Sequence, residues 1–265
     1  AYSKGKITFK DCIVAGDLNG TTDNSSQNMG GFVCSQADDA TCTFDNCLYT
    51  GTNNSKGGYT FAPNPTLNNC YYLNACGKAQ GDKITEAQLE SGEVAHLLQG
   101  TRTENVWGQT LGTDNEPQPT TEAAKRVYKV AFNYNGREAA VRYANNGQGI
   151  HGTLPTAKDL LGNDYNPKLT YALNFGDFTA TTPVTADKTV DVGVDVSGIF
   201  PIATKDDWKE FCGVVNNGVT AVDAKLTADV NLGTEVVWVG DDYNQYGGTF
   251  DGQGHTLSFD WTSQG

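Results

Sequence analysis

Three segments of this sequence repeat one pattern: FKDCIV at residues 9–14, FDNCLY at residues 44–49 and LNNCYY at residues 67–72. In each, an aromatic residue or Leu is followed three positions later by Cys and then by two apolar residues. A second pattern, GGFV at residues 30–33 and GGYT at residues 57–60, alternates with the first. Two motifs that alternate at short intervals predict a solenoid, in which each repeat is one rung.

The spacing within the repeated pattern requires a bend in each strand. In a flat β-strand, residues three positions apart point to opposite faces, so Phe9 and Cys12 could not both be buried. Asp11, Asn46 and Asn69 stand directly before the Cys, and Asp and Asn adopt left-handed backbone angles more readily than other non-Gly residues. We therefore predict that the chain turns a corner at these positions, as in a right-handed parallel β-helix.

The corner is expected to align the repeated side chains in two ladders. One ladder consists of buried free thiols on successive rungs, and the other of the residues three positions before them. The members are Cys12, Cys47 and Cys70, and Phe9, Phe44 and Leu67. Disulfides are the alternative for the Cys residues. Adjacent parallel strands lie about 4.8 Å apart, and the regular motif explains all three positions without cross-links.

These motifs resemble the GLUG-type repeats of bacterial cell-surface proteins, in which a GG-aliphatic-V-G turn precedes FxNC-like strands. Cys34 and Phe61 stand in place of the last Gly of that turn. The segment GGTFDGQGHTLSF at residues 247–259 resembles the opening rung of GLUG-type β-helices and is the most specific motif. The resemblance implies a secreted, extracellular or cell-surface location and a structural or adhesive role.

The rest of the sequence predicts a mainly β protein with four parts. Residues 1–116 are expected to be the C-terminal part of one β-helix, whose open end is covered by short helices within residues 84–98. Residues 117–124 are expected to be a linker. Residues 125–200, with a hairpin turn at Asn135-Gly136, predict a small β-rich spacer domain, either β-grasp-like or sandwich-like. Residues 201–265 are expected to begin a second β-helix with a capping helix.

Local signals place some of these elements more closely. Thr85 and Thr204 are expected helix N-caps. Strands are predicted at residues 224–229 and 236–239. His96, in the predicted helix, and His255, in the opening rung, are both expected to have structural roles.

Composition and motifs restrict the class of function. The 265 residues include 18 Lys and Arg and 31 Asp and Glu, a net charge of −13, which argues against nucleic acid as a partner. No apolar run approaches the ~20 residues that span a bilayer, so no membrane insertion is expected. No GxSxG, HExxH, P-loop or dinucleotide motif occurs, and we expect no enzymatic activity. The alternative is a fragment of a carbohydrate-active β-helix enzyme, a polysaccharide lyase or glycoside hydrolase.

Binding of a glycan or protein ligand on a surface is the remaining class. It would need exposed aromatic side chains, with ladder packing as the alternative for each candidate. The candidates are Tyr49, Tyr71, Tyr72, Tyr243 and Tyr246. No cofactor is expected. Calcium near Asp17, Asn19 and Asp23 is an alternative, because oxygen ligands alternate there, but the later Glu of an EF-hand is missing.

The two ends of the sequence suggest self-association. The start, AYSKGKITFK, shows no apolar signal segment, and we interpret the sequence as a piece of a longer protein. Residues 1–12 would begin a rung with nothing stacked beneath it, and the rung near residues 250–259 would lack a cap. Uncovered strand edges recruit other strands, so head-to-tail association of copies is expected, with a monomer as the alternative.

Overall fold

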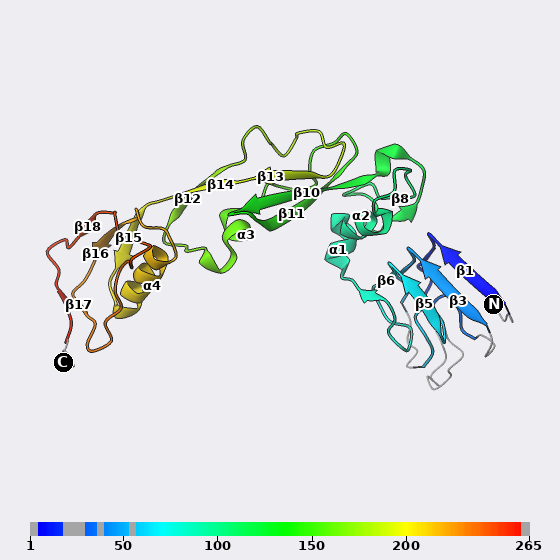
Figure 1. The fold of residues 1–265 in the computed structure, drawn as a ribbon, viewed down its shortest axis with the longest axis horizontal. Coiled ribbons are helices and arrows are strands. Elements are labelled where there is room, and N and C mark those ends of the chain that lie inside the picture. The colour runs from blue at the N-terminus through cyan, green and yellow to red at the C-terminus, as the bar shows by residue number, and fades with distance from the viewer. Residues whose placement is uncertain (1–4, 18–29, 36–39, 53–56, 261–265) are drawn as a thin grey trace. The chain divides into compact units, whose positions relative to one another are not determined.

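The computed structural model describes residues 5–17, 30–35, 40–52 and 57–260 (Figure 1). The fold is mainly β, with 33% strand and 15% helix, and holds several small parallel sheets. Contacts group the chain into two compact units. Unit 1 holds residues 1–131, 141–154 and 178–189, and unit 2 holds residues 132–140, 155–177 and 190–265. Among the described helices, none has the length and apolar character that crossing a membrane requires.

Unit 1 begins with two parallel sheets, called here the N-terminal stack. The first has the order β1 (Lys6–Lys10), β3 (Thr41–Asp45) and β5 (Pro65–Asn68). The second has the order β2 (Ile13–Val14), β4 (Leu48–Tyr49), β6 (Tyr71–Tyr72) and β7 (Asp82–Lys83). A third row of parallel bridges joins Gly30 to Tyr59 and Tyr59 to Lys78. Successive repeats therefore pair in parallel along three rows.

A corner separates the first sheet from the second in every repeat. The corner residues Asp11, Asn46 and Asn69 have φ angles of 53°, 52° and 52°, in the left-handed region that Asp and Asn tolerate. Because the backbone turns there, Phe44 and Cys47 both point inward, and neither has any exposed surface. The predicted bend is confirmed.

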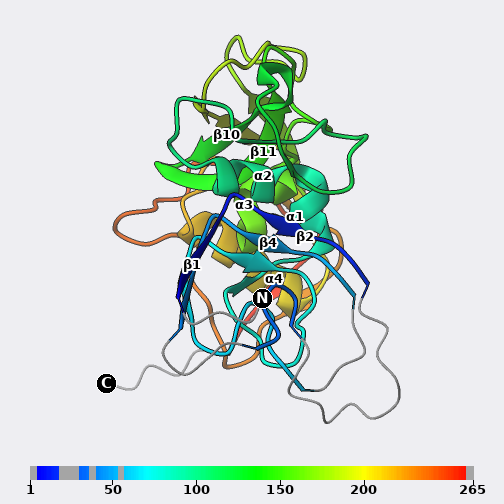
Figure 2. The same cartoon turned by 90° about the vertical axis from the view of Figure 1, so that its right-hand side faces the viewer.

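Two short helices cover a side of the N-terminal stack. These are α1 (Glu86–Ser91), capped as predicted by Thr85, and α2 (Glu93–Gln99). Their apolar residues share one core cluster with Ile13, Leu48 and Tyr71, one residue from each of β2, β4 and β6. Figure 2 shows α1 and α2 beside β2 and β4.

This side position corrects the prediction that the helices cover the open end of the stack. Three strands of the second sheet, β2, β4 and β6, each carry two consecutive apolar residues, as in Leu48-Tyr49. Successive side chains point to opposite faces, so both faces of this sheet are apolar. The outer face of β2, β4 and β6 needs a cover, which α1 and α2 provide.

The remainder of unit 1 is held by short antiparallel pairings. Strand β8 (Trp107–Gly108) pairs with β9 (Gln118–Pro119), which lies within the residues predicted as a linker. A 3₁₀ helix, η1 (Ala123–Lys125), follows.

An antiparallel hairpin follows η1 and contributes residues to both units. Its strands are β10 (Val127–Tyr134) and β11 (Arg137–Asn145), and β13 (Lys188–Asp191) lies on the other side of β10. The turn residues Asn135 and Gly136 have φ angles of 49° and 75°, as the predicted two-residue turn requires.

Unit 2 contains a helical turn, an antiparallel pair and a second set of parallel strands. The helical turn consists of α3 (Ala157–Leu161) and η2 (Gly162–Asp164), and β12 (Thr170–Asn174) pairs with β14 (Gly193–Ser197). The parallel strands, called here the C-terminal stack, are β15 (Ile199–Ile202), β16 (Asp223–Leu226) and β18 (Phe250–Asp251), together with β17 (Val230–Asn231) beside β19 (Leu257–Ser258).

The core of unit 2 is built on one amphipathic helix, α4 (Lys205–Asn216), which begins at the predicted cap Thr204. Its buried residues Trp208, Phe211, Cys212 and Val215 pack with residues of β15 and β16. The predicted strand at residues 236–239 is wrong. This segment is a loop whose Val237 carbonyl accepts a hydrogen bond from Trp208 Nε1 at 2.9 Å, so its apolar residues serve the helix instead of a ladder.

Candidate functional site

The interior of the N-terminal stack holds an aromatic ladder with two facing columns. Phe9 and Phe44 pair in register, and their rings stack 4.9 Å apart with an interplanar angle of 5°. Phe32, in the GGFV motif, and Phe61, which directly follows the GGYT motif, stack in the same way at 5.1 Å and 10°. The columns meet edge to face, with Phe44 and Phe61 5.2 Å apart, a favourable geometry for aromatic pairs.

Leu67 continues the first column by pairing with Phe44. Phe44 has no exposed surface, whereas Phe9 and Leu67, at the two edges of this sheet, are half-buried. The first motif therefore supplies one wall of this core, and the other wall is formed by Phe32 of the second motif and Phe61 directly after it.

The three repeated cysteines lie beside this core and are free. Cys47 and Cys70 are 0% and 3% exposed, and Cys12 is half-buried. Each inner thiol donates to a carbonyl of the preceding repeat, Cys47 Sγ to Phe9 O at 3.6 Å and Cys70 Sγ to Phe44 O at 3.3 Å. These contacts repeat the same geometry one rung further along.

All seven cysteines of the chain are free. Burial raises the pKa of Cys42 and of Cys76, and it raises the pKa of Cys212 to about 11. Only the thiolate is a strong nucleophile, so these thiols are packing groups. Cys34 alone is exposed.

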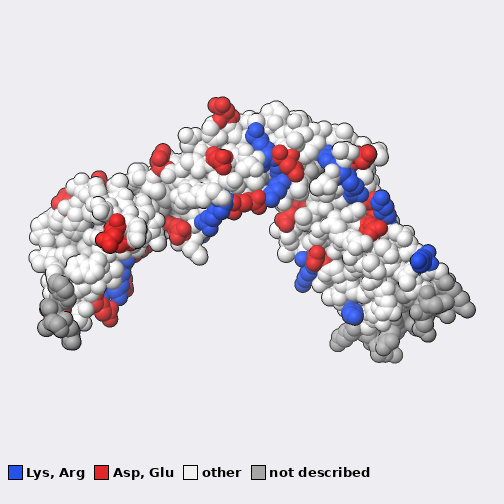
Figure 3. Space-filling view, in the orientation of Figure 1, with Lys and Arg blue, Asp and Glu red and all other residues white. Residues whose placement is uncertain are grey.

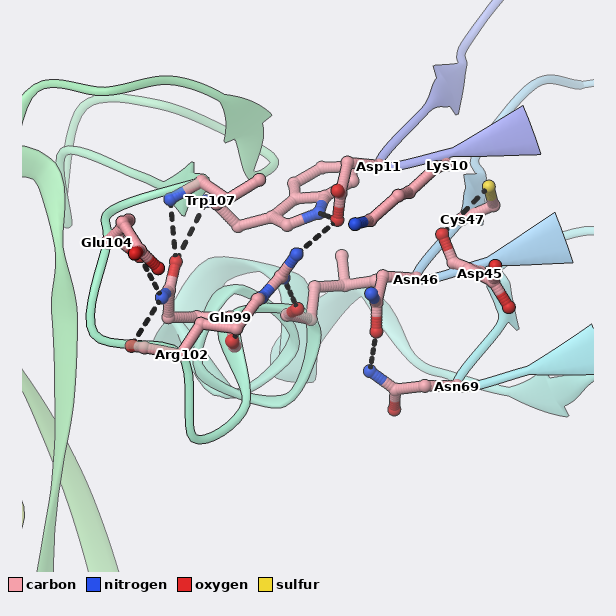
Figure 4. Close-up of polar contacts among 12 residues, drawn as sticks. Lys10, Asp11, Asp45, Asn46, Cys47, Asn69, Gln99, Arg102, Glu104 and Trp107 are labelled. Atoms are coloured by element: carbon pink, nitrogen blue, oxygen red, sulfur yellow. Dashed lines mark hydrogen bonds and ion pairs between the residues drawn. The ribbon is translucent and has the colours of Figure 1, made fainter. Parts of the chain in front are cut away.

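The corner residues form a polar surface to which the segment after α2 is fixed (Figure 4). Asn69 Nδ2 donates to Asn46 Oδ1 at 2.8 Å and to Leu97 O at 3.0 Å. Asp11 Oδ1 accepts from Arg102 Nη1 at 2.5 Å and from Trp107 Nε1 at 3.1 Å. The segment after α2 therefore contacts the corner of the first repeat, and α2 itself contacts the corner of the third.

Buried Gln99 organises this attachment. Its Oε1 accepts from the backbone nitrogens of Val106 and Trp107, both at 2.9 Å. Its Nε2 donates to the carbonyls of Arg102 at 3.1 Å and Glu104 at 2.8 Å. With all its hydrogen bonds made inside the protein, the Gln99 amide has a structural role. The corner surface is thus a structural joint, in which the Asp11 carboxylate is bound by Arg102 and Trp107.

The two histidines of interest each lie beside a carboxylate. His96 Nε2 lies 2.9 Å from Asp187 Oδ2, and its ring lies 5.8 Å from that of Tyr143. His255 Nδ1 lies 3.5 Å from Asp229 Oδ1 on the surface. In the described part of the chain, no group of three His, Cys, Asp or Glu side chains could hold a metal ion.

The candidate ligand-facing tyrosines divide into two groups. Tyr49, Tyr71 and Tyr72 are 0%, 9% and 8% exposed, because they alternate between the ladder core and the helix-covered face. This corrects the suggestion that they face a ligand, since they have almost no surface to offer. Tyr243 is 95% exposed. Tyr246 is half-buried, and its hydroxyl donates to Thr249 O at 2.9 Å.

The suggested calcium segment is described only in part. Asp17 accepts a hydrogen bond from the hydroxyl of Thr52, while Asn19 and Asp23 lie outside the described residues.

Sequence reasoning missed a pocket of about 370 Å³ in unit 2. Its lining comes from the hairpin tip, from residues 161–171, from Val196 of β14, and from α4 with the turn that follows. Since these segments are far apart in the chain and share no motif, sequence patterns could not identify the pocket. The two tyrosines in residues 161–171 are the sequence feature that could have indicated a binding site there.

Comparison with protein-family models, with curated proteins and with solved structures found no match to this chain.

Proposed function

We propose that this chain is a non-catalytic structural and adhesive segment of a secreted bacterial cell-surface protein with GLUG-type repeats, and that its parallel sheets belong to right-handed parallel β-helices. The observation that carries the proposal is the register of the repeats. Phe9, Phe44 and Leu67 pair across β1, β3 and β5, and a left-handed corner follows each of them two residues later. Repetition of one rung suits a structural element.

The paired glycines support the view that both stacks are of one type. A Cβ on Gly31 would lie 2.3 Å from the carbonyl oxygen of Thr60 in the next repeat. A Cβ on Gly248 would lie 2.2 Å from that of Val222. In each stack the second Gly of the motif allows a neighbouring rung to approach closely, and β18 and β19 then continue the parallel pairing.

The non-catalytic part of the proposal is supported by the carboxylates of unit 2. Asp207 and Glu210 are close together, but Lys168 Nζ binds both, at 2.6 Å and 2.5 Å. Asp207 also accepts from the backbone nitrogens of Ala203 and Thr204 at the start of α4. These contacts explain the two carboxylates as part of an ion pair at the start of α4. A glycosidase, by contrast, needs one of its two carboxyl groups to hold a proton.

The charge distribution on the face in Figure 3 fits the same proposal. Basic and acidic side chains are interspersed there, and no continuous basic area covers that face. With a net charge of −13, the chain is unsuited to binding a polyanion such as nucleic acid.

Labelling of intact cells of the source bacterium tests the location and class. We expect antibodies against the chain to label cells without permeabilisation. In parallel, a panel of neutral and acidic polysaccharides should show neither reducing-sugar release nor formation of unsaturated products. Labelling that requires permeabilisation, or turnover abolished by one Asp or Glu substitution, would overturn the proposal and favour the lyase or hydrolase alternative.

We also propose head-to-tail self-association through the edge strands of the two stacks. Within the described residues, β1 is at an edge of its sheet and β18 at an edge of another. Residues 8–10 read Thr-Phe-Lys and residues 249–251 read Thr-Phe-Asp. In-register pairing of two copies would place Phe250 beside Phe9 and Asp251 beside Lys10, about 4.8 Å apart.

Light scattering over a concentration series tests this association. We expect Lys10→Glu to weaken it and the double variant Lys10→Glu with Asp251→Lys to restore it, because the second change returns the opposite charges. A wild type that is monomeric at every concentration would exclude head-to-tail stacking.

A further inference from the structure

The pocket in unit 2 has an apolar floor and an aromatic wall. Leu161 and Leu169, 5% and 8% exposed, form part of the floor together with half-buried Val196. The rings of Tyr165 and Tyr171 lie 5.3 Å apart with an interplanar angle of 32°. At about 370 Å³, the pocket is at the small end of the roughly 300–1,000 Å³ that is typical of small-molecule sites.

The inner polar groups of this pocket are held in place by one another. The Tyr171 hydroxyl accepts from Asn166 N at 2.8 Å and donates to Asn166 O at 3.2 Å. Asn166 Nδ2 donates to Glu210 Oε1 at 2.9 Å, and Lys168 Nζ binds Glu210 Oε2 at 2.5 Å. Since these bonds orient the tyrosine ring and neutralise the carboxylate, the wall is formed before any ligand arrives.

The polar side chains at the rim of the pocket differ from the inner ones, because their donor and acceptor atoms have no partner within the described part of the chain. Arg137, Asn163, Asp164 and Asn217 line the pocket, and within the described part of the chain none of these side chains makes a hydrogen bond or ion pair. Arg137 can only donate, the Asp164 carboxylate can only accept, and the two amides can do both. Their formal charges cancel.

We propose that this pocket binds one neutral pyranose ring of a glycan. Each sugar hydroxyl donates and accepts, so a rim with both kinds of group suits a polyol. A phosphate or carboxylate would need donors alone and would be repelled by Asp164. The apolar face of the ring would pack on Tyr165 and the aliphatic floor. This inference rests on the adhesive part of the proposed function and assigns that part a site.

Titration of isotopically labelled protein, followed by NMR, tests the site. The probes are the methyl glycosides of glucose, galactose and mannose, with galacturonate as the acidic comparison. We expect at least one neutral glycoside to shift the side-chain amide signals of Asn163, Asn166 and Asn217 in a saturable manner, and galacturonate to bind at least ten times more weakly.

Variants locate the binding. Asn163→Ala and Tyr165→Ala are expected to weaken binding of that glycoside at least tenfold. Tyr243→Ala is the matched control, since Tyr243 is in the same unit, is 95% exposed and is not part of the lining; it should bind like the wild type. Should Tyr165→Ala fail to fold, Asn163→Ala decides the question, because Asn163 is exposed and its side chain supports no contact of the fold.

Three outcomes would overturn the inference. No shift with any neutral glycoside excludes the site, while the cell-surface role is still decided separately by antibody labelling of intact cells. Binding that both pocket variants retain places adhesion elsewhere on the chain. Preference for galacturonate rejects the neutral ligand class.

Discussion

In the N-terminal stack, the face that carries Phe44 packs against Phe61 from another part of the same repeats, and the rings meet 5.2 Å apart. In the C-terminal stack, Phe200 of β15 packs against Phe211 of α4, 5.7 Å away. One set of parallel strands therefore fills its core with its own repeated side chains, and the other with a helix inserted between β15 and β16. Repetition distributes the core over many equivalent residues, whereas the helix concentrates it in one element.

The corners of the two stacks differ as well. Each repeat of the N-terminal stack turns at a single left-handed Asp or Asn, whereas the chain between β18 and β19 turns at Gln253 and Gly254, with φ angles of 49° and 79°. A ladder of corner amides is possible only in the first case. It holds Asn69 against Asn46 and leaves Asp11 free to bind Trp107.

The largest effect is expected from Phe44→Ala, which removes a ring without exposed surface from the centre of the ladder. Such truncations cost about 3–5 kcal/mol of unfolding free energy. Phe250→Ala, at a position 38% exposed in the C-terminal stack, is the matched control and should cost less than half as much. Native-state hydrogen exchange of the amides of β3 and β16 measures each stack separately. Equal costs would contradict the difference between a closed ladder and an open edge.

The corner should be the next most sensitive position. Asn46→Ala places a β-carbon in the left-handed region, at a cost of roughly 1–2 kcal/mol. Asn46→Gly loses the same hydrogen bond from Asn69 without that penalty, so chemical denaturation should find it the more stable variant. At the other corner, Gln253→Gly should equal or exceed the wild type, because Gln253 has a positive φ. An Asn46→Gly variant less stable than Asn46→Ala would contradict the left-handed corner.

The helix cap of the C-terminal stack should contribute less. Thr204 Oγ1 accepts from Asp207 N at 3.1 Å, and Thr204→Ala should lower stability by about 1 kcal/mol, the usual value of a lost N-cap. Thr204→Ser retains the hydroxyl and is the control. Thermal unfolding followed by circular dichroism measures both, and an unchanged Thr204→Ala variant would show that Asp207 alone maintains the cap.

The smallest effect is a pH dependence at the same cap. The hydrogen bond from Lys168 lowers the pKa of Asp207 from 3.8 to about 2. A carboxyl group whose pKa is lower in the folded state stabilises the fold above its unfolded pKa, and this stabilisation is lost as the pH falls through the folded value. We therefore expect stability to decline between about pH 4 and pH 2. Asp207→Asn should flatten this part of the curve, and an unchanged slope would contradict the assignment.

The amino-acid sequence by itself determined the local features of this protein. The corner at Asn46, the caps Thr85 and Thr204 and the hairpin turn at Asn135-Gly136 depend on backbone preferences within a few residues, and each is where the sequence predicts it. The pairing of Phe9 with Phe44 also follows from sequence, because a repeated motif in parallel strands stacks equivalent positions.

Only the tertiary structure decided which surfaces meet. The side position of α1 and α2 depends on the apolar side chains that β2, β4 and β6 direct away from the ladder core. Trp107 binds Asp11, which lies 96 positions away in the chain. The pocket in unit 2 joins side chains from four separate segments, whose local patterns are ordinary. Contacts of this kind leave no periodic signal, because they arise from the fit of complete elements and not from the spacing of neighbouring residues.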